Sequence, residues 1–183
     1  MSSSKIRLGI LGGGGNSLIG VLHRIASSMF DRYQIVGGVF NPNWDENIEF
    51  ATKIGLPTDR VYIDFETLVA QELQLPKEQR MQVVSILTPN FLHFSMAKKL
   101  LENGFHVICE KPLGIRLDEV DELIACCDRN NVHLFTVMQN RYNATNKLLK
   151  LAIDKRRFGK IFSCNVTVRW CRGISYYQED NGW

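Results

Sequence analysis

Short apolar runs alternate along most of the chain with segments whose apolar residues recur at helical spacing. The apolar runs, which predict strands, lie at residues 6–11, 33–40, 61–63, 82–87, 105–109 and 132–138. The segments between them, which predict helices, lie at residues 18–26, 44–54, 64–75, 91–103 and 117–129. Strands that are apolar throughout and alternate with helices form a parallel sheet covered on both faces. The pattern therefore predicts an α/β fold with a doubly wound parallel sheet.

The first apolar run leads directly into four glycines, Gly12 to Gly15, and then into the first predicted helix. Glycine accepts positive φ, and because it has no Cβ it lets a bulky anion approach the amides at a helix N-terminus. A strand, a glycine turn and a helix in this order are typical of a pyrophosphate site, and hence of a dinucleotide. A glycine-rich surface turn without a ligand is the alternative interpretation.

The glycine spacing departs from the usual GxGxxG fingerprint. Gly12 and Gly14 supply the first two glycines, but Ser17 stands at the place of the third. If residues 15–17 are an insertion, the pattern is restored, because Gly20 then serves as the glycine that lets the helix pack closely. Ser17 is a good N-cap residue, which suits a longer turn into the helix.

Polar residues follow the other predicted strands. In a doubly wound sheet the ligand lies outside the carboxyl ends of the strands. The residues at these ends are Asn41–Asn43, Thr88–Asn90, Glu110–Pro112 and Gln139–Asn140. Asn41 stands where an acid would hold the ribose hydroxyls and a base would favour a 2′-phosphate, so NAD and NADP are not distinguished. Asp45 and Glu46 are interpreted as acids in the first turn of a helix. Asn90 also fits a helix cap, and His93 also fits a core histidine.

Glu110, Lys111 and Pro112 carry the strongest candidate chemistry. A lysine at the carboxyl end of a central strand faces the crevice, where it can exchange a proton with a substrate oxygen. We expect partial burial to lower the pKa of Lys111 and Glu110 to oppose that shift. The proline sets the chain direction, through a trans or a cis bond. A surface ion pair between Glu110 and Lys111 is the alternative.

The pattern changes after residue 140. Residues 143–157 predict a helix with a basic end, and residues 160–170 alternate like a strand of an open sheet with one solvated face. Residues 173–183 offer no hydrophobic pattern that would close a second core. We therefore expect a dinucleotide-binding domain at 1–141, followed at 142–183 by a linker helix and the first strand of a truncated C-terminal α/β substrate domain.

The segments GGGGNSLIGVLHR and LTPNFLHFSMAKKLLENGFHVICEKPL, in this order and spacing, resemble the Gfo/Idh/MocA family of glucose-fructose oxidoreductase and inositol dehydrogenase. The resemblance covers residues 6–139. It implies an N-terminal Rossmann domain and a C-terminal domain with an open, mainly antiparallel sheet. It also implies hydride transfer between NAD or NADP and a secondary alcohol of a sugar, cyclitol or related small-molecule substrate, and a homo-oligomeric full-length protein.

Lys111 matches the lysine that is treated as catalytic in that family, and the resemblance places Glu110 and Lys111 beside the nicotinamide. The expected cofactor-binding residues are Gly12, Gly13, Gly14, Ser17, Leu18, Ile19, Asn41, Thr88, Pro89, Asn90, His93, Glu110, Lys111 and Gln139. Family enzymes usually supply an Asp or His from the second domain, which the resemblance places beyond Trp183.

Composition excludes other classes. The formal net charge is +3 with acids and bases interspersed, which argues against a nucleic-acid partner. No run reaches the length of a transmembrane helix, and residues 1–4 are too short and polar for a signal peptide, so we expect a cytoplasmic protein without a membrane partner. The five cysteines match neither a zinc site nor a CxxC motif, so we expect no metal. Cys126 and Cys127 are interpreted as small core residues.

Three alternatives remain at this level. A Rossmann module could sense dinucleotides without catalysis, and the same family also implies nucleotide-sugar dehydrogenases and reductases of biliverdin-like or dihydrodiol compounds. An S-adenosylmethionine enzyme with a glycine-rich first loop is disfavoured by the EKP segment.

Overall fold

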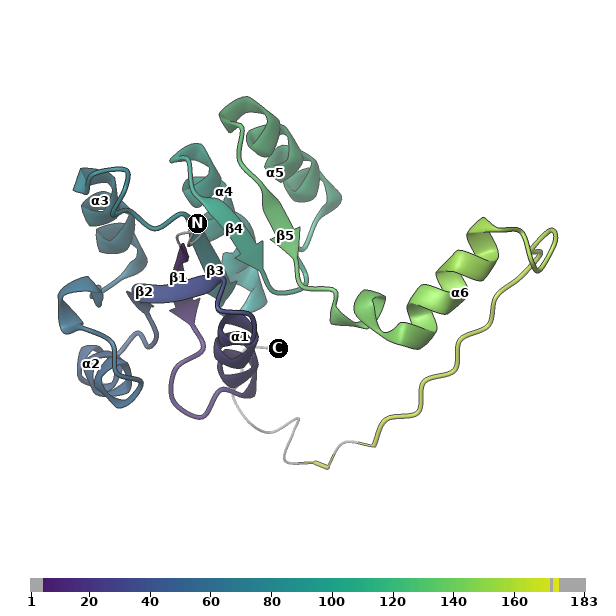
Figure 1. The fold of residues 1–183 in the computed structure, drawn as a ribbon, viewed down its shortest axis with the longest axis horizontal. Coiled ribbons are helices and arrows are strands. Elements are labelled where there is room, and N and C mark those ends of the chain that lie inside the picture. The colour runs from purple at the N-terminus through teal and green to yellow at the C-terminus, as the bar shows by residue number, and fades with distance from the viewer. Residues whose placement is uncertain (1–4, 172, 175–183) are drawn as a thin grey trace. The chain divides into compact units, whose positions relative to one another are not determined.

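The computed structural model describes residues 5–171, 173 and 174, and it divides into two compact units, 1–137 and 138–183. The first unit is built on a five-stranded sheet in the order β2-β1-β3-β4-β5 (Figure 1). The strands are β1 (Ile6–Gly12), β2 (Tyr33–Val39), β3 (Val83–Leu87), β4 (His106–Cys109) and β5 (Leu134–Thr136). All pairs are parallel, which confirms the predicted doubly wound sheet. The strand order reverses between β1 and β3, so the crevice of such a fold lies at their carboxyl ends.

Helices cover both faces of this sheet (Figure 1). They are α1 (Leu18–Ser28), α2 (Trp44–Lys53), α3 (Phe65–Gln74), α4 (His93–Glu102) and α5 (Leu117–Asn130), with the 3₁₀ turns η1 (Thr58–Arg60) and η2 (Asn90–Leu92). One core cluster joins α3, α4 and α5 to the sheet and contains Leu68, Leu100 and Leu123. The other joins α2 to the opposite face and contains Phe50, over whose ring the guanidinium of Arg24 in α1 lies.

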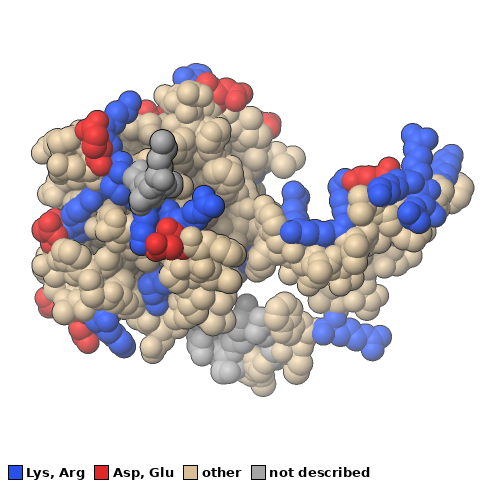
Figure 2. All heavy atoms as spheres, viewed as in Figure 1, with Lys and Arg blue, Asp and Glu red and all other residues tan. Residues whose placement is uncertain are grey.

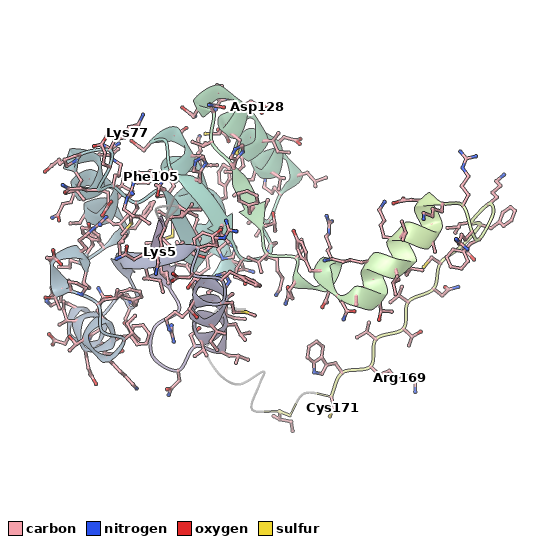
Figure 3. The ribbon with its side chains drawn as sticks, in the orientation of Figure 1. Lys5, Lys77, Phe105, Asp128, Arg169 and Cys171 are labelled. Carbon is pink, nitrogen blue, oxygen red and sulfur yellow. The ribbon has the colours of Figure 1, made fainter. Side chains whose placement is uncertain are left out.

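The core is closed by residues that flank the strands as well as by the strands themselves. Phe105, directly before β4, is only 1% exposed, and Figure 3 labels its position. Cys126 and Cys127 of α5 belong to or pack against the first cluster, as expected of small core residues. Figure 2 shows acidic and basic side chains interspersed over the visible face of the sheet unit.

The predicted third strand at residues 61–63 is wrong. Val61 makes a single isolated bridge with Gly38 of β2, and the amide of Tyr62 donates to the Gly38 carbonyl. The chain leaves the sheet edge at once, because Asp64 caps α3 by accepting a hydrogen bond from the amide of Thr67. The contact is too short to form a ladder, and the sheet has five strands.

The second unit contains the 3₁₀ turn η3 (Gln139–Tyr142) and the helix α6 (Ala144–Asp154), which Asn143 caps through the amide of Thr145. The strand expected at residues 160–170 does not form. These residues are exposed, and within the described part of the unit no neighbouring segment pairs with them. An alternating sequence becomes a strand only beside a hydrogen-bonding neighbour. The interpretation of residues 142–183 as the start of a substrate domain stays a prediction, and residues 175–183 lie outside the described part.

Among the described residues, no helix combines the length and the apolar character that a membrane span requires. Nor does that part of the chain hold a group of three or more His, Cys, Asp or Glu side chains that could bind a metal ion.

Candidate functional site

The glycine turn between β1 and α1 uses its glycines for backbone conformation. Gly12, Gly13 and Gly15 have positive φ values of 79°, 70° and 55°, a region that residues with a Cβ rarely adopt. Ser17 caps α1, accepting a hydrogen bond from the amide of Gly20 at 3.1 Å, as its sequence position predicts. The turn therefore enters the helix through the predicted longer loop.

Gly20 packs directly on the turn. A Cβ built on Gly20 would lie 1.8 Å from the carbonyl oxygen of Gly13, so this position of α1 accepts no side chain without a backbone shift. Arg24, one turn later, donates to the same Gly13 carbonyl at 3.0 Å. These contacts confirm the predicted role of Gly20 as the glycine of close approach, and they hold the start of α1 against the turn.

Gly14 faces β2. Its amide donates to the carbonyl oxygen of Phe40 at 3.1 Å, and a Cβ at this position would lie 2.6 Å from the same oxygen. The amide of Gly14 is therefore engaged within the protein, so Gly14 brings the turn against the end of β2 and does not present this donor to a ligand.

A cleft of about 520 Å³ opens at the carboxyl ends of β1, β2 and β3. This volume lies within the range of sites for small molecules and cofactors. Its lining residues are Leu11, Gly12, Gly13, Val39, Phe40, Asn41, Pro42, Ile63, Asp64, Phe65, Leu87, Thr88, Pro89, Leu92 and Met96. Five residues expected to bind a cofactor, namely Gly12, Gly13, Asn41, Thr88 and Pro89, thus lie together in one cleft.

Sequence reasoning missed one wall of this cleft. Residues 63–65, between the Val61 bridge and α3, line it, as do Leu92 and Met96. Asp64 carried only a helix-cap signal, and the structure shows it in that role as well. The hydrogen bond from the amide of Thr67 holds the pKa of the Asp64 carboxyl below its ordinary value. The apolar side chains of this wall can pack against a flat ring.

Asn41 forms the polar corner of the cleft at the end of β2. Its Oδ1 accepts from the amide of Asn43 at 2.8 Å, and its Nδ2 donates to Glu46 Oε2 at 2.6 Å. The second contact places the Glu46 carboxylate next to the end of β2, where the sequence showed no neighbouring charge. Glu46 also lies in the first turn of α2, where its amide donates to Asn43 Oδ1, so its interpretation as a first-turn acid was correct but incomplete.

His93 is not a ligand-facing residue. It is 1% exposed, its Nδ1 lies 2.6 Å from the carbonyl oxygen of Pro112, and its Nε2 lies 2.8 Å from that of Thr88. The alternative interpretation as a core histidine is the correct one. The ring joins two loops that end neighbouring strands, β3 and β4. Asn90 begins η2 and does not cap α4, because no side-chain cap bond is found there.

Glu110 and Lys111 follow β4, and the Lys111–Pro112 bond is cis. The Glu110 side chain is 13% exposed, whereas Lys111 is exposed, so the expected partial burial of the lysine is wrong. The reason is local: the loop carries Lys111 past the end of the strand, away from the packed faces. The amide of Lys111 donates to Glu110 Oε2 at 3.3 Å.

His23 of α1 was missed by sequence reasoning. Its Nε2 lies 3.0 Å from Glu110 Oε1, and its Nδ1 lies 3.0 Å from Ser85 Oγ of β3. Burial raises the pKa of Glu110, but hydrogen bonds from His23 and from the amide of Lys111, together with nearby positive charge, lower it more, and the net pKa lies below its ordinary value. His23 lies in the segment GGGGNSLIGVLHR, but its neighbours in the sequence gave no sign that it contacts Glu110.

The remaining predicted residues lie around the cleft or outside this unit. Leu18 and Ile19 form the first turn of α1 and are 69% and 38% exposed. Gln139 begins η3 in the second unit, so its expected role stays a prediction. The turn, the cleft and the Glu110 loop together offer backbone donors at a helix start, an apolar pocket and an exposed amine, which suits an elongated ligand with phosphates near its middle.

Comparison with known proteins identifies relatives of this chain. The family model described as an oxidoreductase family with an NAD-binding Rossmann fold matches residues 6–138. An uncharacterized oxidoreductase of Bacillus subtilis, YfiI, is 34% identical over 128 residues, which is 69% of this chain and 32% of that protein. The myo-inositol 2-dehydrogenase of Thermotoga maritima is 26% identical over 164 residues, which is 90% of this chain and 45% of that protein.

Two solved structures share the fold. An inositol dehydrogenase homologue from Azotobacter vinelandii, complexed with NADH and myo-inositol, superposes with a TM-score of 0.81 at 33% identity, over 86% of this chain and 41% of that chain. The WlbA dehydrogenase from Bordetella pertussis, in complex with NADH and UDP-GlcNAcA, superposes with a TM-score of 0.81 at 30% identity, over 98% of this chain and 50% of that chain. The chain thus spans about a third to a half of the length of these relatives.

Proposed function

Because the chain belongs to the Gfo/Idh/MocA oxidoreductase family, whose N-terminal part is an NAD-binding Rossmann fold, we propose that its cleft binds NAD(H) or NADP(H). The observation that carries this proposal is the contact between Gly13 and Gly20 at the mouth of the cleft. A turn without side chains, held at the start of a helix, is the arrangement that lets a diphosphate approach backbone amides.

The residues of the cleft fit the parts of such a cofactor. The turn at Gly12 and Gly13 would hold the diphosphate, and the pocket between Asn41 and residues 63–65 would take the adenosine. Thr88 and Pro89 would continue along the cofactor toward the loop at Glu110. Supporting this assignment, a Cβ on Gly12 would meet the carbonyl oxygen of Leu87 at 2.9 Å, so the turn packs directly against the end of β3 and requires glycine at this position.

We propose that the chain is the cofactor-binding part of an enzyme that acts on a secondary alcohol. The bound nicotinamide supplies the site that accepts or returns a hydride. Lys111, exposed at the end of β4, takes the hydroxyl proton of the substrate or returns it. Glu110 stays ionised beside it, because its pKa is lowered.

The substrate class follows from the relatives. Similarity to inositol dehydrogenases supports a cyclitol or sugar as the substrate. A nucleotide-linked sugar is the second candidate, because the WlbA dehydrogenase structure with UDP-GlcNAcA covers 98% of this chain, including the part after residue 138. A non-catalytic dinucleotide sensor is the third, and retained cofactor binding without turnover toward either substrate class would favour it.

Ligand titration tests the cofactor assignment. NAD⁺ and NADP⁺, titrated separately against the chain, are expected to raise its melting temperature in a saturable manner. Ile63→Glu places a negative charge in the cleft and is expected to weaken binding about tenfold, a loss of about 1.4 kcal/mol. Ile124→Glu is the matched control, since Ile63 and Ile124 are both 55% exposed and Ile124 lies on α5 outside the cleft. Absence of stabilisation by both nucleotides rejects the assignment.

A lysine variant tests the catalytic role. In the full-length enzyme assayed with its alcohol substrate, Lys111→Ala is expected to cut turnover severely. Nucleotide affinity is expected to stay nearly unchanged, because the lysine lies outside the lining of the cleft. Retained turnover would reject the role of Lys111 in proton transfer.

A further inference from the structure

A partly buried histidine connects the glycine-turn helix with the loop after β4. His23 projects from α1, its Nδ1 lies 3.0 Å from Ser85 Oγ of β3, and its Nε2 lies 3.0 Å from Glu110 Oε1. The side chains of His23 and Glu110 are 15% and 13% exposed, and Ser85 is 1% exposed. Three elements that meet at the switch point of the sheet thus share one row of hydrogen bonds.

The chemistry of the three groups sets the direction of these bonds. A carboxylate can only accept hydrogen bonds, so Nε2 of His23 carries the proton and donates to Glu110. In the neutral ring Nδ1 is then an acceptor, and the hydroxyl of Ser85 donates to it. Glu110 uses its other oxygen to accept from the amide of Lys111. Each member of the row is satisfied, and the last bond ends on the backbone of the proposed catalytic residue.

We propose that His23 is a positioning residue, which holds the Glu110 carboxylate and through it the backbone of Lys111 at a fixed place relative to the start of α1. The proposal rests on the proposed function. Its consequence is mechanical: the helix that holds the diphosphate also holds the loop that carries the amine. Because hydrogen bonds at both ring nitrogens hold the His23 side chain in one rotamer, the ring fixes the position of the loop after β4 relative to α1.

A purely space-filling role for His23 makes a different prediction. A leucine would fill most of the same volume and leave the fold intact, but it would leave one oxygen of Glu110 without its donor. The carboxylate would then be free to rotate, and Lys111 would lose the fixed acceptor of its amide. Glutamine, in contrast, places an N–H near the position of Nε2 and can still donate to Glu110.

The experiment compares His23→Leu, His23→Gln and Ser85→Ala with the wild-type chain. His106→Leu is the control, because His106 is a partly buried histidine at the opposite end of β4. Nitrogen NMR of the His23 ring reports the tautomer, and the amide resonance of Lys111 reports its response to NADH. Affinity for NADH is measured on the same samples.

The wild-type ring is expected to carry its proton on Nε2. His23→Leu is expected to reduce the NADH-induced shift of the Lys111 amide more than twofold, with NADH affinity changed less than about threefold. His23→Gln is expected to restore the shift, and the His106→Leu control to leave it unchanged. If His23→Leu does not fold, the glutamine and Ser85→Ala variants take its place, and Ser85→Ala is expected to broaden or shift the His23 ring signals.

Two results would overturn the inference: a proton on Nδ1 in the wild type, or equal Lys111 responses in His23→Leu and the control. If the wild-type chain does not bind NADH, the proposed function fails by itself. The position of Lys111 is then judged from its free amide resonance, which must move in His23→Leu and stay in place in His106→Leu for the inference to hold.

Discussion

Gly20 approaches Gly13 so closely that a Cβ on Gly20 would lie 1.8 Å from the Gly13 carbonyl oxygen. The contact joins the third residue of α1 to the loop that opens the cleft. Since the obstructing atom belongs to the backbone, no rotamer change can relieve it. The position of the loop, and with it the proposed diphosphate site, therefore depends on the missing side chain of Gly20.

Replacing Gly20 by alanine tests this contact through the sign of the change in the free energy of unfolding. Gly→Ala inside a helix normally stabilises a protein by up to about 1 kcal/mol. Here we expect Gly20→Ala to destabilise the chain by about 1–3 kcal/mol, because the methyl group forces α1 away from the turn. Chemical denaturation measures the change, and NADH affinity is expected to fall with it.

Val21→Ala is the matched control, since Val21 is the next residue of the same helix and is 38% exposed. It is expected to change stability by less than about 1 kcal/mol. Stabilisation by Gly20→Ala equal to the helix-propensity gain would show that α1 does not rest on Gly13.

The carboxylate of Glu46, bonded to Asn41 at the end of β2, predicts cofactor preference. A negative charge at this place repels the 2′-phosphate of NADP, so we expect the chain to prefer NAD⁺. Glu46→Gln keeps an acceptor for Asn41 and removes the charge, and is expected to raise NADP⁺ affinity about fivefold, or about 1 kcal/mol, with NAD⁺ affinity unchanged. Calorimetric titration of both nucleotides measures this.

Glu49→Gln serves as the control for Glu46, because Glu49 is an exposed acid one turn later on the same helix. Equal effects of the two variants on NADP⁺ binding would mean that only the general charge of α2 acts, and that the contact with Asn41 carries no selectivity.

The sequence was sufficient where local chemistry decides the structure. Glycines after an apolar run, followed by a serine cap, specify the turn and predict the packing role of Gly20. The parallel sheet follows in the same way, from apolar runs alternating with helical segments. Each of these depends on residues that are close in the chain.

The rest depended on partners distant in the chain. His23 and Glu110 are 87 positions apart, and nothing in either segment marks them as a pair. His93 looked equally suited to ligand or core until its two carbonyl partners were seen. The strand at residues 160–170 failed for the related reason that a strand exists only when a second segment lies beside it. Lys111 is exposed, against expectation, because the path of the loop after β4 determines its burial and the residue type does not.

His93 is expected to contribute strongly to stability. Its ring lies between the carbonyl oxygens of Thr88 and Pro112, at 2.8 and 2.6 Å. His93→Ala opens a cavity in place of the buried ring and removes the N–H that donates to one of these carbonyls, so we expect a loss of about 2–4 kcal/mol in the free energy of unfolding.

The exposed His133 provides the comparison for His93. Urea denaturation of His133→Ala is expected to show a change below about 1 kcal/mol. A loss of similar size in both variants would indicate that the two carbonyl contacts do not stabilise the fold.

Glu72 forms the most enclosed charged cluster of the sheet unit. It is fully buried, and its carboxylate accepts from Arg60, from the hydroxyl of Tyr62 and from the amide of Met81. Glu72→Ala leaves the partly buried guanidinium of Arg60 and two further donors without this acceptor, so we expect a loss of about 3–5 kcal/mol. Glu66→Ala, on the exposed face of the same helix, is expected to cost less than about 1 kcal/mol in the same denaturation experiment. Equal losses would contradict the role of the cluster.

The buried thiol of Cys109 is expected to make the stability of the fold depend on pH in the alkaline range. Burial, and then the charge of Glu110, raise the pKa of this thiol to about 12 from an ordinary value of 9.0. Above pH 9 the unfolded chain releases the thiol proton while the folded chain keeps it, so the folded state binds more protons and loses stability as the pH rises. The window runs from about pH 9 to about pH 12, with a slope of up to about 1.4 kcal/mol for each pH unit.

The variant Cys109→Ala isolates this contribution. Other groups with raised pKa values, such as Tyr62 and Cys127, act equally in both proteins and cancel in the difference. Between pH 8 and pH 10 the wild type is expected to lose about 1 kcal/mol more than the variant, measured by urea denaturation at each pH. Parallel losses in the two proteins would mean that the thiol of Cys109 ionises as readily in the folded chain as in the unfolded one, which its complete burial next to the Glu110 carboxylate does not allow.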